Sequence, residues 1–327
     1  MQGILPFVVR RLIWAPFVLL AVSLVTFALG RFGPGDPVEI LQGQYHDPER
    51  VEAIRHEQGL DDPFFAQYGR YMWDVFHGDL GTSFTYLGVP VKDIIFDKMW
   101  VTIQYNLVAL IIIFAIGIPA GIWAALRQGT WQDPLTIGGF LFFRSVPVLV
   151  TIPVLQFIFA LKLGWLPSSG WVEKDILGMK IGIFDKRIIM PILALSLPGI
   201  AGVARLMRAQ TLEVLDEDFV RTARAKGLRE IVVITRHVAR NALLPMTTIV
   251  GFALVGLLGG SLFVEALFGI PGIGQFTWEA VGNRDYDVIM AVTLITATAF
   301  IVANLVTDIA YGFIDPRVRL GAGGPRY

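Results

Sequence analysis

Residues 12–30 read LIWAPFVLLAVSLVTFALG, a continuous apolar stretch without a charged side chain. A helix needs about 20 apolar residues to cross about 30 Å of hydrocarbon, so this stretch is long enough to span a membrane. Arg10 and Arg11 precede it, just as basic residues precede the apolar core of a secretory signal peptide. The apolar part is long for a signal, however, and residues 31–36, RFGPGD, form no small-residue cleavage site. The sequence therefore predicts an uncleaved first span.

The composition of the whole chain agrees with a membrane protein. Of its 327 residues, 54% are hydrophobic and 17% are charged, and the mean hydropathy is +0.62. An ordinary soluble domain has about 25% charged residues. The formal net charge is zero, so no overall basic field points to nucleic acid, and the absence of cysteine excludes disulfides and thiolate metal sites.

Five further apolar stretches predict a bundle of six transmembrane helices, which makes the fold class all-α integral membrane. Prolines within them are tolerated because neighbouring helices satisfy the freed backbone groups. The chain divides into residues 1–30 with the first span, a small irregular outer loop domain at 31–100, and a transmembrane core at 101–327 that includes a polar loop at 213–245. The five stretches are Val101–Leu126, Leu135–Leu161, Ile188–Met207, Met246–Phe268 and Val288–Ile309.

The distribution of basic residues predicts the orientation of the six spans. With the N-terminus in the cytoplasm, the cytoplasmic segments carry fourteen Lys and Arg residues, and the short outer loops carry six. Cytoplasmic loops are enriched in these residues, so both termini are expected to be cytoplasmic.

A polar loop at residues 213–245, between the fourth and fifth spans, predicts a short helix. The loop begins acidic and turns basic before Gly227, an order that complements the helix dipole. Asp216 or Asp218 is the expected N-cap, and Gly227 is expected just after the C-cap. Phe219 and Ala223, four residues apart, are expected to share one apolar face.

A second helical stretch, residues 229–244, leads from this helix into Pro245 and the next span. A short amphipathic helix backed by a helix that enters the membrane suits a docking element for a soluble partner. The alternative is an ordinary charged connector that follows the distribution of basic residues, and the physical pattern alone leaves both open.

Several motifs within the loop resemble a known family. RTARAKG at 221–227, followed by RH at 236–237 and RNALLP at 240–245, resembles the EAA loop of ABC importer permeases, and more narrowly that of the dipeptide/oligopeptide permeases. Arg221 and Thr222 stand where the general pattern has Glu and Ala, a departure that is usual in the peptide branch. Other segments match the family in order: RFGPGDP (31–37), GLD (59–61), QY (67–68), GDLGTS (78–83), GWLP (164–167), PGIG (271–274), RDY (284–286) and DPRVR (315–319).

The resemblance implies a type I ABC importer permease with a large first outer loop, in a bacterial or archaeal cytoplasmic membrane. The implied partners are a second, related permease in a heterodimer, two ATPase subunits that use ATP and Mg, an extracytoplasmic substrate-binding protein and the lipid bilayer. The permease itself is expected to bind no cofactor. The cargo stays open among peptides, nickel chelates, glutathione and oligosaccharides. The residues implied in ATPase coupling are Asp216, Glu217, Asp218, Phe219, Val220, Arg221, Thr222, Ala223, Arg224, Ala225, Lys226 and Gly227.

Polar residues within the spans are candidates for a substrate path, because they are costly in hydrocarbon. Arg144 is interpreted either as a pore-facing cation or as a structural arginine near Pro147. Gln104, Asn106 and Gln156 either line a polar path or bond between helices. Two further interpretations are that Asn304 and Asp308 are a packing pair and that Glu265 lies at a headgroup boundary.

Other functional classes find little support in the sequence. A phosphate-binding G-x-x-x-x-G-K-[ST] motif does not occur, so an ATPase has to be a separate subunit. A secondary transporter driven by an ion gradient is the alternative function, but it is expected to show inverted repeats and midplane acids. An intramembrane enzyme needs a reactive pair within the spans, and no histidine falls there. The histidines of the first loop, His46, His56 and His77, match no ligand spacing, so no catalytic or metal site is predicted.

Overall fold

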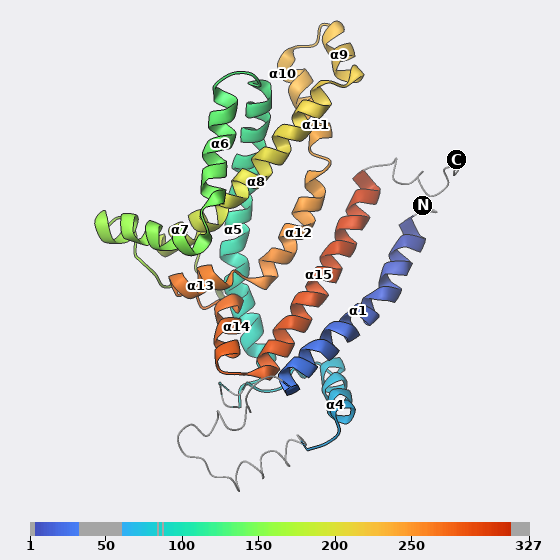
Figure 1. Ribbon diagram of the computed structural model, residues 1–327, viewed down its shortest axis with the longest axis vertical. Helices are drawn as coiled ribbons and strands as arrows, with labels where there is room; N and C mark the ends of the chain where they lie inside the picture. The colour runs from blue at the N-terminus through green and yellow to red at the C-terminus, as the bar shows by residue number, and fades with distance from the viewer. Residues whose placement is uncertain (1–3, 33–60, 84, 87, 315–327) are drawn as a thin grey trace.

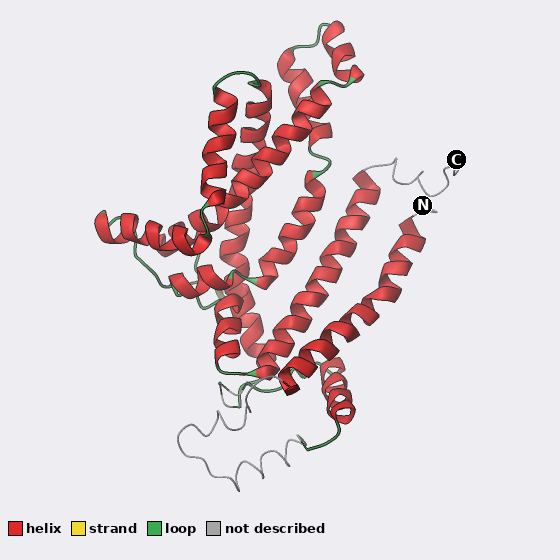
Figure 2. Ribbon diagram, viewed as in Figure 1, coloured by secondary structure: helices red, strands yellow, loops and turns green. Residues whose placement is uncertain are grey.

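The computed structural model describes residues 4–32, 61–83, 85–86 and 88–314. The predicted histidines His46 and His56, most of the RFGPGDP segment and the DPRVR segment lie outside these residues. Most of the described chain is helical (Figure 2).

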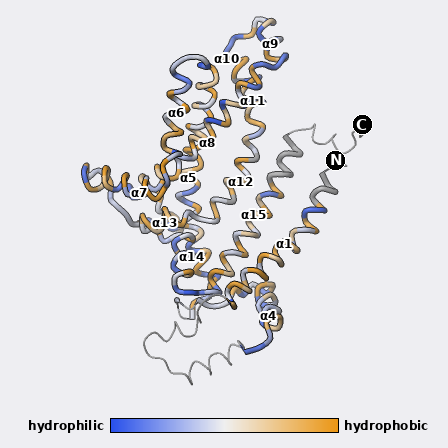
Figure 3. The backbone as a smooth tube through the Cα atoms, viewed as in Figure 1, coloured by the Kyte–Doolittle hydropathy of each residue, from blue (hydrophilic) through white to orange (hydrophobic). Residues whose placement is uncertain are grey.

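Four long helices are apolar enough to cross a membrane as single elements. They are α1 (Ile4–Phe32), α5 (Val91–Leu126), α8 (Ile189–Leu215) and α15 (Tyr286–Ile314). Two bent helix pairs pass the same test, which gives up to six spans among the described residues and agrees with the predicted six. Hydrophilic residues gather at the two ends of the bundle, and apolar residues cover the long helices between them (Figure 3).

The third predicted span, Leu135–Leu161, is not a straight helix. It consists of α6 (Gln132–Ser145), α7 (Val148–Leu155) and a π-helical continuation, η1 (Gln156–Lys162), and the two halves are bent by 97°. Pro147 causes the break, because proline disfavours helical geometry in the residue before it. Val146 is accordingly extended, with φ −85° and ψ 123°. The predicted third span is thus present as a bent helix pair, and the prolines within it mark the interruption.

The fifth predicted span is bent as well, by 44°, between α12 (Met246–Gly259) and α13 (Leu262–Phe268). Gly260 lies between the two helices with φ +69°, a conformation that favours glycine. Helix α14 (Ile273–Gly282) follows and packs against α13, α5 and α15.

The centre of the bundle is the contact between α5 and α8, and glycines allow these helices to approach closely. A methyl group on Gly121 would lie 2.5 Å from the Ala204 carbonyl oxygen, and one on Gly117 would lie 2.8 Å from Val203 Cγ1. Helices in membranes associate through such small residues, because lipid chains offer no hydrophobic drive for helix pairing. The close approach of α5 and α8 therefore depends on glycine, which has no side chain, at these two positions.

Helices α1 and α15 pack together at one side of the bundle, with the start of α1 beside the end of α15 (Figure 1). Both of these ends point toward the end of the bundle that carries α9 (Asp218–Ala225), which we call the α9 end. The loop between α9 and α12 contains α10 (Glu230–Val232), η3 (Val233–Val238) and α11 (Ala239–Ala242).

The opposite end, which we call the α4 end, carries helix α4 (Phe64–Phe76) in the predicted outer loop (Figure 1). Between η1 and α8, strands β1 (Lys174–Ile176) and β2 (Met179–Ile181) pair antiparallel, with Lys174 opposite Ile181, and the short helix η2 (Lys186–Ile188) follows. A hydrogen bond joins the predicted outer loop to the start of α15. The buried Asp285, directly before α15, accepts it from the Ser83 hydroxyl at 2.6 Å.

Candidate functional site

Helix α9 ends where the sequence predicts, because Lys226 is its C-cap and Gly227 follows directly. This residue has φ +76°, which glycine adopts without steric cost. Its backbone N–H donates to the Arg224 carbonyl oxygen at 2.9 Å, and the Leu228 N–H donates to the Ala223 carbonyl oxygen at 3.4 Å. These two bonds form a Schellman motif, which satisfies carbonyl groups that the end of the helix would leave without partners.

The predicted N-cap of α9, Asp216 or Asp218, was wrong, because the N-cap is the residue between them. Glu217 occupies the N-cap position, and its side chain makes no capping bond. Asp216 is the C-cap of α8, whereas Asp218 is the first residue of α9. Only a tight turn separates the two helices, so the end of α8 decides where α9 begins.

The buried face of α9 also differs from the predicted pair. Val220 is completely buried and Ala223 is 5% exposed, whereas Phe219 is 41% exposed. Val220 and Ala223 pack against Val233 and Val238 of η3. The inner face is thus formed by residues three apart, and Phe219 points away from this small core.

An ion pair joins α9 to the following helix. Arg224 donates to both carboxylate oxygens of Glu230, at 3.2 Å and 2.7 Å. The guanidinium hydrogen bonds hold the pKa of Glu230 below its usual value. The two buried residues and this pair fix α9 at the tip of the bundle.

Apart from its two buried residues, α9 is exposed along its length. The exposed face combines Phe219 with Arg221, whose side chain is 68% exposed. Leu228 and Ile231 add exposed apolar surface close by. Aromatic residues and arginine are enriched in protein interfaces, so this face has the composition of a docking surface.

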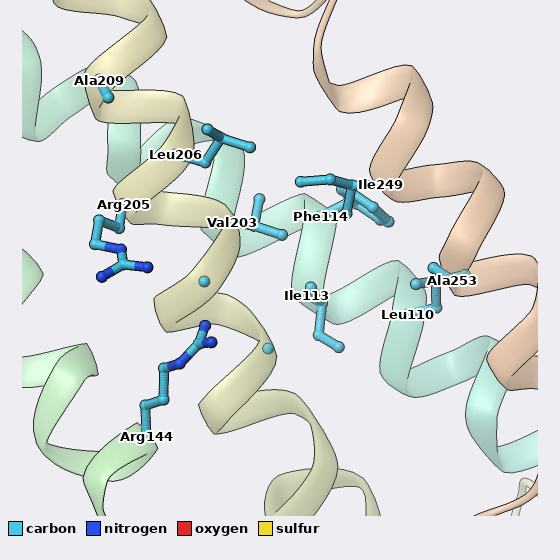
Figure 4. Close-up of a pocket in the computed structure, with 12 residues that line it drawn as sticks. Leu110, Ile113, Phe114, Arg144, Val203, Arg205, Leu206, Ala209, Ile249 and Ala253 are labelled. Carbon is cyan, nitrogen blue, oxygen red and sulfur yellow. The ribbon is translucent and has the colours of Figure 1, made fainter.

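A cavity of about 650 Å³ lies between α5, α6, α8 and α12, and we call it the α8 cavity. Arg144, one of the candidates for a substrate path, lines it together with Arg205 of α8 (Figure 4). The other lining residues are apolar or glycine. The place of Arg205 in this cavity is not recognisable from the sequence, because the residue lies close to the end of the predicted fourth span and counts there among the basic residues that flank the loop.

The three predicted amides do not line the α8 cavity, and each bonds to backbone groups. Gln104 accepts from Gly182 N–H at 2.8 Å and donates to the Lys180 carbonyl, which ties the β-hairpin to α5. Asn106 of α5 donates to the Gly256 carbonyl of α12, and Gln156 of η1 donates to the carbonyls of Ser168, in the following loop, and Leu267 of α13. Asn106 and Gln156 thus bond between helices, whereas Gln104 bonds a helix to a hairpin.

Glu265 is fully buried, so the interpretation as a headgroup residue was wrong. Its Oε1 accepts from the hydroxyls of Tyr105 at 2.5 Å and Thr102 at 2.9 Å, and its Oε2 accepts from Gln275 N–H at 2.9 Å. Thr102 in turn accepts from Ile273 N–H at 2.9 Å. Glu265 therefore neutralises the beginning of α14 and joins it to α5 and α13.

The remaining sequence candidates show structural contacts. Asn304 lines the space between α15 and α1, and the Asp308 side chain lies outside what the structure describes, so their interpretation as a packing pair stays a prediction. The ring Nδ1 of His77 lies 2.7 Å from the Trp73 carbonyl oxygen.

Two family models match the chain. Residues 117–320 match "Binding-protein-dependent transport system inner membrane component", and residues 4–106 match the N-terminal model of the same kind of membrane component. The first match contains α8, the loop with α9, and α12 to α15.

Curated relatives are similar over almost the full chain. The dipeptide transport system permease protein DppB of Alkalihalophilus pseudofirmus is 36% identical over 96% of this chain and 99% of its own length. The oligopeptide transport system permease protein OppB of Haemophilus influenzae is 36% identical, with the same coverage of both chains.

A solved structure shares the fold. The inward-facing MetNI methionine ABC transporter matches with a TM-score of 0.54 and 17% identity, over 68% of this chain and 96% of that chain. At this identity the likeness concerns the fold of the membrane subunit alone.

Proposed function

The chain belongs to the family of binding-protein-dependent transport system inner membrane components and is the pore subunit of an ABC importer; on this premise we propose that its cargo is a peptide or peptide-like solute and that α9 docks the ATPase. The cargo proposal rests on the dipeptide and oligopeptide permeases among its relatives. Family membership also makes it a multi-pass inner membrane protein and indicates no enzymatic role.

The exposed face of α9 carries the docking proposal. Val220 and Ala223 belong to a small core that also includes Val214 and Leu215 at the end of α8, so we expect α9 to move together with that end. A force on α9 therefore reaches α8, which packs along α5 through the centre of the bundle. ATP-driven closure of two ATPase subunits would shift the pore between its inward-open and outward-open states through this connection.

The partners and cofactors follow from the same proposal. Family membership implies ATPase subunits, further membrane subunits and a binding protein. We propose that the second membrane subunit is a related permease, that the importer contains two ATPase subunits, and that ATP and Mg are used there. The permease provides the path and binds no cofactor of its own.

Reconstitution of the complete importer with its binding protein tests the function. We expect uptake of a tripeptide such as tri-alanine only with ATP inside the vesicles and with both ATPase subunits present. A protonophore should leave this uptake unchanged, because no ion gradient drives it. Uptake that persists without the ATPase and collapses with the protonophore would support the secondary transporter instead.

We propose that the α9 end faces the cytoplasm. Arg205–Arg240, around α9, contributes eight of the basic residues that favour this side. The chain has no cysteine, so single cysteines report accessibility without a background. In right-side-out vesicles a membrane-impermeant maleimide should label Arg70→Cys on α4 and should reach Lys226→Cys only after the membrane is opened. Labelling of the second site in intact vesicles, with the first protected, would reverse the orientation.

A further inference from the structure

The walls of the α8 cavity are divided between charged and apolar groups. Figure 4 shows the guanidinium groups of Arg144 and Arg205 at one edge of α8 and apolar side chains of α5 and α12 toward its other edge. Gly199 and Gly202 of α8 line the same cavity and place no side chain in it. A volume of about 650 Å³ lies within the range of small-molecule sites. A cavity of this kind suits a solute with one anionic end and an apolar remainder.

Both cavity arginines lack an acidic partner within the described part of the chain. The next arginine along α8 shows the contrast. Arg208 lies three residues after Arg205 and pairs through two hydrogen bonds with Asp133 at the start of α6. Of the three arginines between α6 and α8, the two at the cavity are therefore left with uncompensated positive charge.

The position of these charges argues against contact with lipid tails. Arg144 lies twelve residues into α6, roughly 18 Å along the helix from its start at the α9 end. Charged groups at such depth almost always face a bundle interior or a water-filled path. Arg144 therefore marks a polar path, and Arg205, one turn before the Asp133-paired Arg208 on α8, adds positive potential nearer the α9 end.

Gly202 of α8 makes room for the Arg144 side chain. A methyl group at this position would lie 2.6 Å from Arg144 Nη1, so any larger residue would displace the guanidinium group. The backbone of α8 thus supports the arginine where it borders the cavity. Its planar group presents fixed donors, which suits a carboxylate.

We propose that Arg144 and Arg205 form a binding subsite for a carboxylate of the transported solute, with its apolar part against α5 and α12. This subsite deepens the proposed function and rests on it. In a peptide, the C-terminal carboxylate is the group that such a subsite takes. Charge-assisted hydrogen bonds from two guanidinium groups would then select anionic solutes during passage.

The test compares tri-alanine with its C-terminal amide as cargo for the reconstituted importer, each at a concentration that saturates the binding protein. In Arg144→Gln with Arg205→Gln, we expect the ratio of tri-alanine to amide uptake to fall by about tenfold or more, because a charge-assisted bond exceeds a neutral one by at least that factor. Arg144→Lys with Arg205→Lys should keep most of the preference. Arg127→Gln, an exposed arginine outside the cavity, is the control for charge removal and should not change the ratio.

The outcomes separate the subsite from the wider function. Equal loss of both uptakes in the glutamine variant would overturn the subsite, because it would indicate a structural role or pairing with an acid of the partner permease. An unchanged ratio would overturn it as well. If the unaltered importer takes up neither probe with ATP, the proposed cargo class itself fails, and the subsite fails with it.

Discussion

Removing two exposed side chains from α9, in the variant Phe219→Ala with Arg221→Ala, is expected to reduce transport and retention of the ATPase subunits by about tenfold or more. Truncating an aromatic or arginine hot-spot residue typically costs about 2 kcal/mol or more of binding free energy. Both side chains point away from the small core beneath the helix. The permease should therefore reach the membrane in normal amounts while the ATPase dissociates during purification.

Two comparisons distinguish docking from folding in this experiment. Phe65→Ala removes an even more exposed phenylalanine from α4, at the other end of the bundle, and should leave ATPase retention unchanged. Val220→Asp places a charge in the core beneath α9 and should lower the amount of folded permease. Full ATPase retention in the Phe219/Arg221 variant, with normal transport, would show that α9 is not the docking element.

Replacing Glu265 by alanine is expected to destabilise the purified permease by about 3 kcal/mol or more, because several buried donors lose their acceptor at once. The Tyr105 hydroxyl, the Thr102 hydroxyl and the Gln275 N–H all donate to this carboxylate. Denaturant or thermal unfolding in detergent measures the loss. Glu265→Gln should be milder but still destabilising, because its amide group is a donor placed among donors.

Glu279→Ala provides the matched control for Glu265, since Glu279 lies on α14 and is half-buried. It accepts one side-chain hydrogen bond from Gln275, at 3.0 Å, and its loss should cost about 1 kcal/mol or less. If Glu265→Ala were no more damaging than Glu279→Ala, the buried network would not hold α5, α13 and α14 together.

Local features of the fold follow from the sequence because they depend on residues close together in the chain. The number of apolar stretches sets the number of spans, since the bilayer fixes the required length. Gly227 ends α9 because the left-handed conformation is nearly free of cost for glycine. The sequence shows Pro147 but does not predict the 97° bend that follows Ser145. A proline within a span can also be accommodated without a break, so its presence alone does not decide the geometry.

The sequence predicted the amphipathic helix α9, but it did not predict which face of that helix is buried. An eight-residue helix with Phe219, Val220 and Ala223 offers two apolar pairs, and the sequence does not rank them. The position of Val233 and Val238 selects Val220 for burial and leaves Phe219 exposed. Likewise, Arg144 was a candidate on its own, but Arg205 and the cavity between them required the packing of α6 on α8.

By itself, the sequence determined that this chain is a six-span membrane subunit and that a capped helix lies between its fourth and fifth spans. Hydrophobic length and backbone conformation are properties of neighbouring residues. Only the tertiary structure decided that Glu265 is a buried junction rather than a surface residue, because its partners Tyr105 and Thr102 lie about 160 residues earlier in the chain. A carboxylate in an apolar stretch is costly until distant donors surround it, and only the folded bundle brings those donors to it.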